Sequence, residues 1–156
     1  MRIGIFLIAL LLSASPAFAW EARVVGVADG DTITVEPAVG GDRVRVRLYG
    51  IDAPEARQSY GQAAKGFVNS AALYKQVEID AGGRDRYGRT VAIVTVAGVG
   101  VLQELLLDAG LAWVYPQYCK DCAAWLERQT AARKAGKGLW ADGHPVPPWE
   151  WRKAHR

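Results

Sequence analysis

The sequence has few of the side chains on which zinc and redox sites depend. It contains two cysteines, Cys119 and Cys122, and two histidines, His144 and His155. A structural zinc site needs four such ligands, and the two histidines have no finger-like spacing. The C-x-x-C spacing fits a structural disulfide, a redox-active pair or two free thiols. We expect the disulfide, because the N-terminus indicates export to an oxidising compartment and no βαβ pattern of a thioredoxin-like motif is visible.

Long apolar runs are also missing, apart from one at the N-terminus. Arg2 precedes an apolar run over residues 3–12, and Ala17-Phe18-Ala19 has the small-residue pattern of a cleavage site. The run is too short to span a bilayer comfortably, and no stop-transfer pattern follows. We therefore predict a signal peptide over residues 1–19, with an uncleaved N-terminal anchor as the alternative. The predicted location is the periplasm or the medium outside the cell.

Neither charge is in strong excess. The chain has 19 lysines and arginines against 16 acidic residues, a net charge of +3, and residues 1–19 carry only one of these charges. A protein that coats nucleic acid through bulk charge is far more basic. Binding to a polyanion must therefore depend on individually placed arginines and on metal. Residues 20–156 suffice for one domain with its own core, and we expect a monomer.

Hydrophobic periodicity predicts a mainly β domain followed by helices. Residues 22–27, 32–35, 42–51, 77–80 and 90–96 have the alternation or valine content of strands. Helical spacing is found over residues 63–74 and 101–109, and from an N-cap at Asp121 to about Lys134, with Trp125, Leu126 and Ala132 expected to face inward. The predicted fold class is α+β, mainly β: a five-stranded OB-fold barrel capped by three helices.

Three polar clusters lie at the ends of predicted strands or in turns. They are Asp29-Gly30-Asp31-Thr32, the segment from Arg47 to Glu55, and Asp85-Arg86-Tyr87-Gly88-Arg89. Strand ends of a barrel can converge on one rim, where Asp31 and Asp52 would suit a hard cation such as Ca²⁺. By itself, however, the first cluster also fits an ordinary hairpin turn, because Asp-Gly is a common turn dipeptide.

The arginines and Glu55 have two readings each. Arg47 lies close in sequence to Asp52, and Arg89 comes from a separate hairpin, so both guanidinium groups can bind one phosphate. Glu55 follows the stiff residue Pro54 and can reach a metal-bound water. Alternatively, the arginine row on the predicted strand is a solvated face, Glu55 only balances the arginines, and the third cluster is an exposed basic turn.

Taken together, the three clusters resemble the staphylococcal nuclease (thermonuclease) family. The similarity runs from about Val24 to Trp140 and includes Gly110-Leu111-Ala112 and Gly138-Leu139-Trp140. It implies a Ca²⁺-dependent nuclease domain over residues 20–142. Such an enzyme hydrolyses phosphodiester bonds of DNA and RNA with low sequence specificity and leaves 3′-phosphate products.

The resemblance also implies a role for each site residue. The calcium ligands would be Asp31, Asp52 and the backbone carbonyl of Ala53, where the family usually has threonine. Glu55 would be the general base, and Arg47 and Arg89 the phosphate clamp. Arg86 and Tyr87 would contact the terminal phosphate and the base, and a tyrosine of the later segment, Tyr118 in preference to Tyr115, would stack on the base. Alternatively, Tyr115 and Tyr118 only pack at the mouth of the barrel.

Two other interpretations stay open. An exported OB-fold module could bind single-stranded nucleic acid without cutting it, although such a module does not need the complete set of acidic and arginine residues. The Pro/Trp-rich tail, residues 143–156, could contact a membrane surface or a partner. Otherwise Trp149 and Trp151 fold back onto the barrel.

Overall fold

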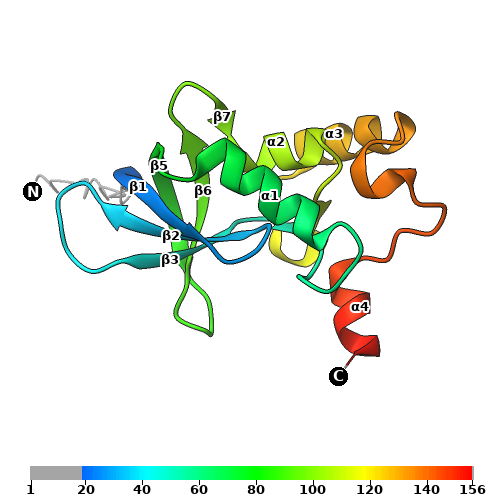
Figure 1. Cartoon of the computed structure of the whole chain (residues 1–156), viewed down its shortest axis with the longest axis horizontal. Helices are drawn as coiled ribbons and strands as arrows, with labels where there is room; N and C mark the ends of the chain where they lie inside the picture. The colour runs from blue at the N-terminus through cyan, green and yellow to red at the C-terminus, as the bar shows by residue number, and fades with distance from the viewer. Residues whose placement is uncertain (1–18, 156) are drawn as a thin grey trace, which may run out of the picture.

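The computed structural model describes residues 19–155 (Figure 1). The predicted signal peptide therefore lies outside the described residues, except for Ala19, which begins the first strand. No helix within residues 19–155 is long and apolar enough to cross a membrane.

Five strands form a closed barrel. They are β1 (Ala19–Val27), β2 (Thr32–Pro37), β3 (Val44–Leu48), β5 (Gln76–Arg84) and β6 (Thr90–Val96). The sheet order is β3-β2-β1-β5-β6, with antiparallel neighbours, and a parallel pairing of β3 with β6 closes the ring. A short strand, β7 (Gly100–Val101), pairs antiparallel with the end of β6. The structure confirms the predicted mainly β, five-stranded OB-fold barrel.

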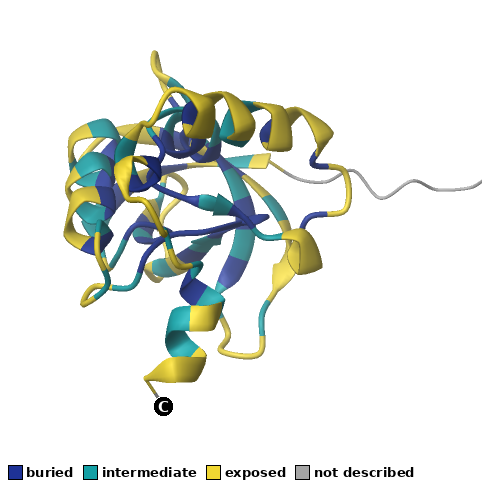
Figure 2. Ribbon diagram, turned by 90° about the vertical axis from the view of Figure 1, so that its right-hand side faces the viewer, coloured by how far each residue is buried: buried dark blue, intermediate teal, exposed yellow. Residues whose placement is uncertain are grey.

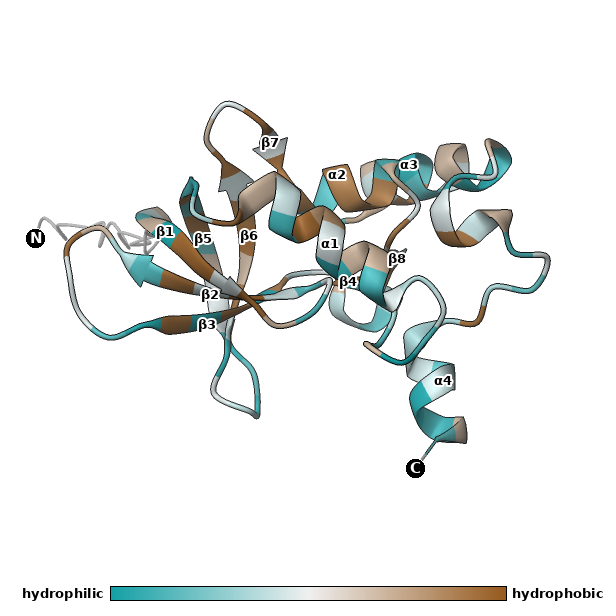
Figure 3. Ribbon diagram, viewed as in Figure 1, coloured by the Kyte–Doolittle hydropathy of each residue, from teal (hydrophilic) through white to brown (hydrophobic). Residues whose placement is uncertain are grey.

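Alternating side chains fill the barrel. Ile33, Val46, Ile79 and Val94 are fully buried, each on a different strand. In β3 the valines and leucine point inward, whereas Arg45 is exposed, as the period of two predicts. Figure 2 shows buried residues concentrated in the central strands and exposed residues on the outer faces of the helices and in the loops. Figure 3 shows hydrophobic residues concentrated in the strands and in one short helix, α2.

The helices cover one side and one end of the barrel. They are α1 (Gly61–Ala72), α2 (Leu102–Asp108) and α3 (Ala123–Lys134). α1 buries Ala64, Val68 and Ala72, and α2 packs beside α3, where Arg128 binds two carboxylates of α2. Two short 3₁₀ helices, η1 (Pro116–Tyr118) and η2 (Gly138–Ala141), connect these elements.

Two details of the third predicted helix are wrong. Residue Cys122, without a side-chain cap, precedes α3 in place of Asp121. Trp125 and Ala132 are buried as expected, but Leu126 is 44% exposed. Positions 125 and 132 are seven residues apart and share one face of the helix, whereas position 126 is turned by about 100° from this face.

The tail contains a further helix that the sequence analysis did not predict. It is α4 (Pro148–Ala154), which begins with a proline in its first turn. Proline is favoured there because the first turn of a helix has no partner for the missing N–H. Figure 1 shows α4 near the C-terminus, below the last connecting loop and apart from α2 and α3.

The predicted strand over residues 42–51 is interrupted. Gly50 takes a positive φ of 69°, and β4 (Ile51–Asp52) leaves the barrel to pair with β8 (Trp113–Val114). A Cβ atom on Gly50 would lie 2.6 Å from the Sγ of Cys119 and 2.9 Å from the ring of Trp125. Glycine therefore serves both the turn and the close packing, and the bend carries Asp52 away from the barrel wall toward the rim.

The strand predicted over residues 77–80 is longer than expected. β5 continues to Arg84, and a bulge between Ala81 and Gly83 lets it remain paired with β6. A bulge inserts an extra residue into one strand and increases its twist without ending the ladder. The chain turns only after Asp85, so the third polar cluster forms the tip of a long hairpin.

Candidate active site

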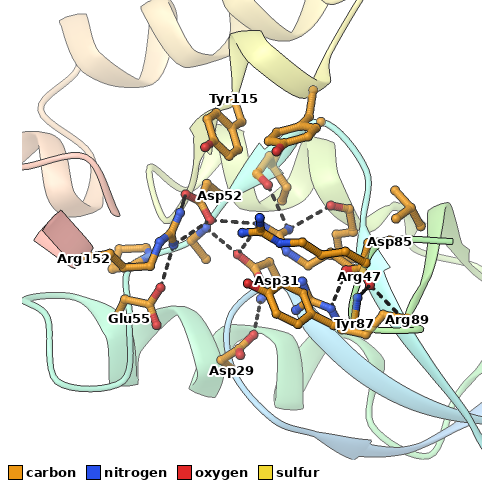
Figure 4. A pocket seen from close by; sticks show the side chains of 18 residues that line it. Asp29, Asp31, Arg47, Asp52, Glu55, Asp85, Tyr87, Arg89, Tyr115 and Arg152 are labelled. Atoms are coloured by element: carbon orange, nitrogen blue, oxygen red, sulfur yellow. Dashed lines mark hydrogen bonds and ion pairs between the residues drawn. The ribbon is translucent and has the colours of Figure 1, made fainter. Parts of the chain in front are cut away.

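A single cleft of about 570 Å³ at the barrel rim collects the three polar clusters (Figure 4). This volume falls in the usual range of ligand sites. Its lining includes every residue for which the sequence predicted a catalytic, metal-binding or substrate-binding role, namely Asp31, Arg47, Asp52, Ala53, Glu55, Arg86, Tyr87, Arg89, Tyr115 and Tyr118. It also includes Asp29, Asp85 and Arg152, which the sequence analysis did not assign to the site.

Asp31 and Asp52 converge on one guanidinium group. Arg47 Nη2 lies 2.8 Å from Asp52 Oδ1 and 3.2 Å from Asp31 Oδ2. Arg47 Nη1 donates to the backbone oxygens of Leu48, at 2.9 Å, and Ile51, at 2.8 Å. These bonds span the bend at Gly50, so the local fold of the β3–β4 segment fixes the arginine between the two carboxylates.

The segment around Asp31 packs tightly against the next cluster. A Cβ atom on Gly30 would lie 2.7 Å from the Cβ atoms of Ala53 and Ala64, so only glycine permits this approach. The backbone N–H of Ala53 then donates to Asp31 Oδ2 at 2.7 Å. The hydroxyl of Thr32 donates to Asp31 Oδ1 at 3.2 Å.

Burial leaves the two aspartates with little solvation. It raises the pKa of Asp31 to about 7, against the opposing effect of Arg47 and with added repulsion from Asp29 and Asp52. Burial also raises the pKa of Asp52, although Arg152 and Arg47 oppose the shift. A desolvated carboxylate pair of this kind favours the approach of a cation.

In the third cluster, Asp85 fixes the position of Arg89 by hydrogen bonds within the turn. Asp85 Oδ2 accepts a bond from Arg89 Nε at 2.7 Å, and Asp85 Oδ1 accepts the backbone N–H groups of Tyr87 and Arg89 at 2.9 and 3.0 Å. Burial would raise the pKa of Asp85, but these bonds outweigh it and lower the pKa. Arg89 Nη1 also donates to the Thr32 hydroxyl at 3.2 Å, which connects this hairpin to Asp31.

Glu55 carries a partner that the sequence analysis missed. Arg152, on α4, places Nη1 2.6 Å from Glu55 Oε1 and Nη2 2.8 Å from Asp52 Oδ2. Burial opposes the charge of Arg152, but the two carboxylates outweigh it and raise the pKa of its guanidinium. In the sequence Arg152 is one basic residue of a Pro/Trp-rich tail, and no pattern around it indicates a contact with residues 97 to 100 positions away.

Aromatic rings border the cleft. The rings of Tyr115 and Tyr118 are 4.8 Å apart, and Trp149 of the tail stacks on Tyr115 at 4.8 Å with an interplanar angle of 6°. Trp149 therefore packs back onto the domain, whereas Trp151 stacks on His155 within the tail. Tyr118 and Tyr87 are 56% and 69% exposed, which leaves their rings accessible to a ligand. Cys119 and Cys122 form a disulfide directly after Tyr118.

The donor set fits a hard cation. Within residues 19–155, no three histidine, cysteine or acidic side chains are grouped to hold a metal on their own. Two buried carboxylates, supplemented by backbone carbonyls and water, are nevertheless the oxygen ligands that Ca²⁺ accepts, and its coordination is flexible. The desolvated pair Asp31 and Asp52 has this chemistry.

Comparison with known proteins identifies the family. A family model described as "Staphylococcal nuclease homologue" matches residues 45–142, which contain most of the cleft. The chain belongs to the staphylococcal nuclease family. An "uncharacterized endonuclease" of Haemophilus influenzae is 38% identical over 98% of this chain and 84% of its own length.

Two further relatives of this staphylococcal nuclease homologue carry nuclease names. An "uncharacterized endonuclease" of Escherichia coli O157:H7 is 42% identical over 85% of the chain and 84% of its own length. A "micrococcal nuclease" of Shigella flexneri is 33% identical over 94% of the chain and 89% of its own length. Family membership and these names support a nuclease function.

Proposed function

We propose that this family member is a Ca²⁺-dependent nuclease that hydrolyses phosphodiester bonds of DNA and RNA and leaves 3′-phosphate products. One observation carries the proposal: Asp31, Asp52, Glu55, Arg47 and Arg89 line one cleft. A module that only binds nucleic acid has no use for two desolvated carboxylates beside a third carboxylate. Repulsion between the phosphate backbone and these groups would weaken binding in the absence of a cation.

In the proposed mechanism, Asp31, Asp52 and the carbonyl of Ala53 hold the cation. When bound, Ca²⁺ supplies Lewis-acid activation of the phosphate and of a water molecule. Glu55 takes the proton of the water that attacks phosphorus. The bond from phosphorus to the 5′ oxygen breaks, and that oxygen leaves as a hydroxyl after it takes up a proton from solvent. Arg47 and Arg89 stabilise the charge that develops on the phosphate oxygens, and each such preorganised donor contributes about 3 kcal/mol to the transition state.

Substrate binding uses the rest of the cleft. Arg86 contacts a terminal phosphate, and the exposed rings of Tyr87 and Tyr118, with Tyr115 beside them, stack on bases. Phosphate contacts and stacking carry little sequence information, which accounts for the proposed low specificity.

We further propose that the protein is exported after cleavage of residues 1–19, acts in the periplasm or outside the cell, and is a monomer. The disulfide supports this location, because such bonds persist in oxidising compartments. The proposed nuclease domain covers residues 20–142, and residues 143–156 are the proposed tail, of which Trp149 and Val146 contact the domain.

Cleavage of end-labelled single-stranded DNA and RNA tests the proposal. We expect Ca²⁺ to support cleavage and a chelator to abolish it. If the products carry a 3′-phosphate and a 5′-hydroxyl, polynucleotide kinase should label their 5′ ends without prior phosphatase treatment, whereas terminal transferase should extend their 3′ ends only after the 3′-phosphate is removed. Cleavage that persists in excess chelator rejects the metal-dependent mechanism. Binding without cleavage at any Ca²⁺ concentration supports the non-catalytic OB-fold module instead.

A further inference from the structure

The tail brings a guanidinium group into the proposed cation site that the mechanism above does not use. Arg152 Nη2 lies 2.8 Å from Asp52 Oδ2, and Arg152 Nη1 lies 3.3 Å from Asp52 Oδ1 and 2.6 Å from Glu55 Oε1. Figure 4 shows Arg152 on the side of Asp52 that faces Glu55, while Arg47 approaches from the other side. One side chain therefore engages both a proposed metal ligand and the proposed general base.

A divalent cation and Arg152 compete for the carboxylate oxygens of Asp52. Its Oδ1 atom accepts Arg47 at 2.8 Å and Arg152 at 3.3 Å, and its Oδ2 atom accepts Arg152 at 2.8 Å. A divalent ion that binds Asp52 must take one of these oxygens from a guanidinium group. It also repels the positive charge that is left beside it.

Of the two arginines, Arg152 is the one that a cation can displace from Asp52. Arg47 is additionally bound to two backbone oxygens, Leu48 and Ile51, and its side chain is 15% exposed. Within the described chain, the side-chain hydrogen bonds of Arg152 go to Asp52 and Glu55, and this side chain is 37% exposed. It also lies on a seven-residue helix near the C-terminus. A short terminal helix can move at lower cost than the β3–β4 bend.

The tail is fastened beside the site at two other points. Trp149 stacks on Tyr115, and Gln58 donates to the backbone oxygen of Val146 at 2.6 Å. These contacts keep Arg152 close to the carboxylates and so raise its effective concentration there. An internal cation held in this way competes with a free cation even when the single ion pair is weak.

We propose that Arg152 is an internal counter-ion that competes with the divalent cation for Asp52 and, when displaced, also releases Glu55. It thereby sets the cation concentration at which the enzyme becomes active and couples metal binding to exposure of the general base. This inference rests on the proposed function, because it assigns the cation to Asp52 and the proton transfer to Glu55.

Titration with Ca²⁺ alone, without nucleic acid, tests the competition. Calorimetry compares wild-type protein with Arg152→Gln and with Lys153→Gln, which removes the same charge from an exposed neighbour on α4. We expect Arg152→Gln to bind Ca²⁺ about tenfold more tightly, equivalent to about 1.4 kcal/mol. Lys153→Gln should change the affinity by less than about twofold, because a distant exposed charge is screened. Equal affinities of the two variants overturn the proposal.

Displacement of the tail has its own readout. Hydrogen exchange of the peptide that contains residues 148–154 should become faster when Ca²⁺ is added to the wild-type protein, and unchanged exchange contradicts the proposal. Arg152→Lys keeps the charge but loses the two-pronged geometry, so its Ca²⁺ affinity should fall between those of the wild type and Arg152→Gln.

The outcomes separate this inference from the function on which it rests. Ca²⁺-dependent cleavage with equal affinities in all variants rejects the counter-ion role and leaves the nuclease proposal intact. Absence of Ca²⁺ binding in every variant rejects the proposed cation site, and the counter-ion role with it.

Discussion

Replacement of Arg47 by methionine should destabilise the fold, independently of any catalytic role. The arginine and its two partners are largely shielded from water: the exposed fractions of the side chains are 15% for Arg47, 9% for Asp31 and 2% for Asp52. Loss of one member of a buried ion pair typically costs 3–5 kcal/mol, because the remaining charge is desolvated and uncompensated. Arg152 still neutralises part of the charge on Asp52, so we expect the lower end, about 3 kcal/mol.

Urea denaturation at pH 7 without divalent cations measures this loss. Arg45→Met is the matched control, since Arg45 lies on the same strand but is exposed, and it should change the free energy of unfolding by less than about 0.5 kcal/mol. Because Arg47 opposes the rise in the pKa of Asp31, which is about 7 even so, Asp31 should take up a proton in Arg47→Met, and the loss of stability should be smaller at pH 6 than at pH 8. A loss in Arg47→Met no larger than that in Arg45→Met would refute the role of Arg47 as an internal cation.

Three further predictions concern the hairpin and the core. Arg89→Gln should lower kcat for DNA cleavage by about a hundredfold or more while it costs only about 1 kcal/mol of stability through loss of the ion pair with Asp85. The exposed neighbour Arg84→Gln should leave kcat nearly unchanged, and equal losses of kcat would argue against a specific role. Asp85→Asn should lower the free energy of unfolding by about 1 kcal/mol at pH 7. Because the pKa of Asp85 in the folded protein is lowered from 3.8, the difference in stability between wild type and variant should vanish as the pH falls through that lowered pKa. A constant difference in stability down to pH 2 would contradict the ion pair. Gln103→Leu should lower the free energy of unfolding, measured with urea, by about 3 kcal/mol. The fully buried Gln103 accepts a bond from one backbone N–H of β6 and donates to one backbone C=O of β6, and leucine leaves both groups without a partner. An unchanged free energy of unfolding would contradict this role of Gln103.

The barrel and the residues that line the cleft could be predicted because they depend on short sequence patterns. In β3, for example, the alternation of apolar and polar residues indicates which side chains face the core. The Asp29-Gly30-Asp31 turn and the Gly88 turn are fixed by short-range chemistry, and barrel closure brings them to one rim.

The features that the sequence analysis missed depend on tertiary contacts. The sequence pattern around Gly50 is compatible with a continuous strand. The bend that positions Asp52 is explained only by the packing of Gly50 against Cys119 and Trp125. Arg152 lies about a hundred residues from Asp52 in the chain, on a helix too short to have a periodic signature. Polar contacts of this kind leave no mark on hydrophobic patterns.

Measurement of DNA cleavage by the Glu55→Gln variant tests most directly the central claim that Glu55 is the general base of a nuclease site. Single-stranded DNA is incubated with saturating Ca²⁺, and cleavage rate and DNA affinity are measured side by side for wild type, Glu55→Gln and the exposed control Glu127→Gln. The account predicts that Glu55→Gln loses at least about a hundredfold in rate while it still binds DNA, because the amide cannot accept the proton, and that Glu127→Gln behaves as wild type. A Glu55→Gln variant that cleaves at the wild-type rate would contradict the account.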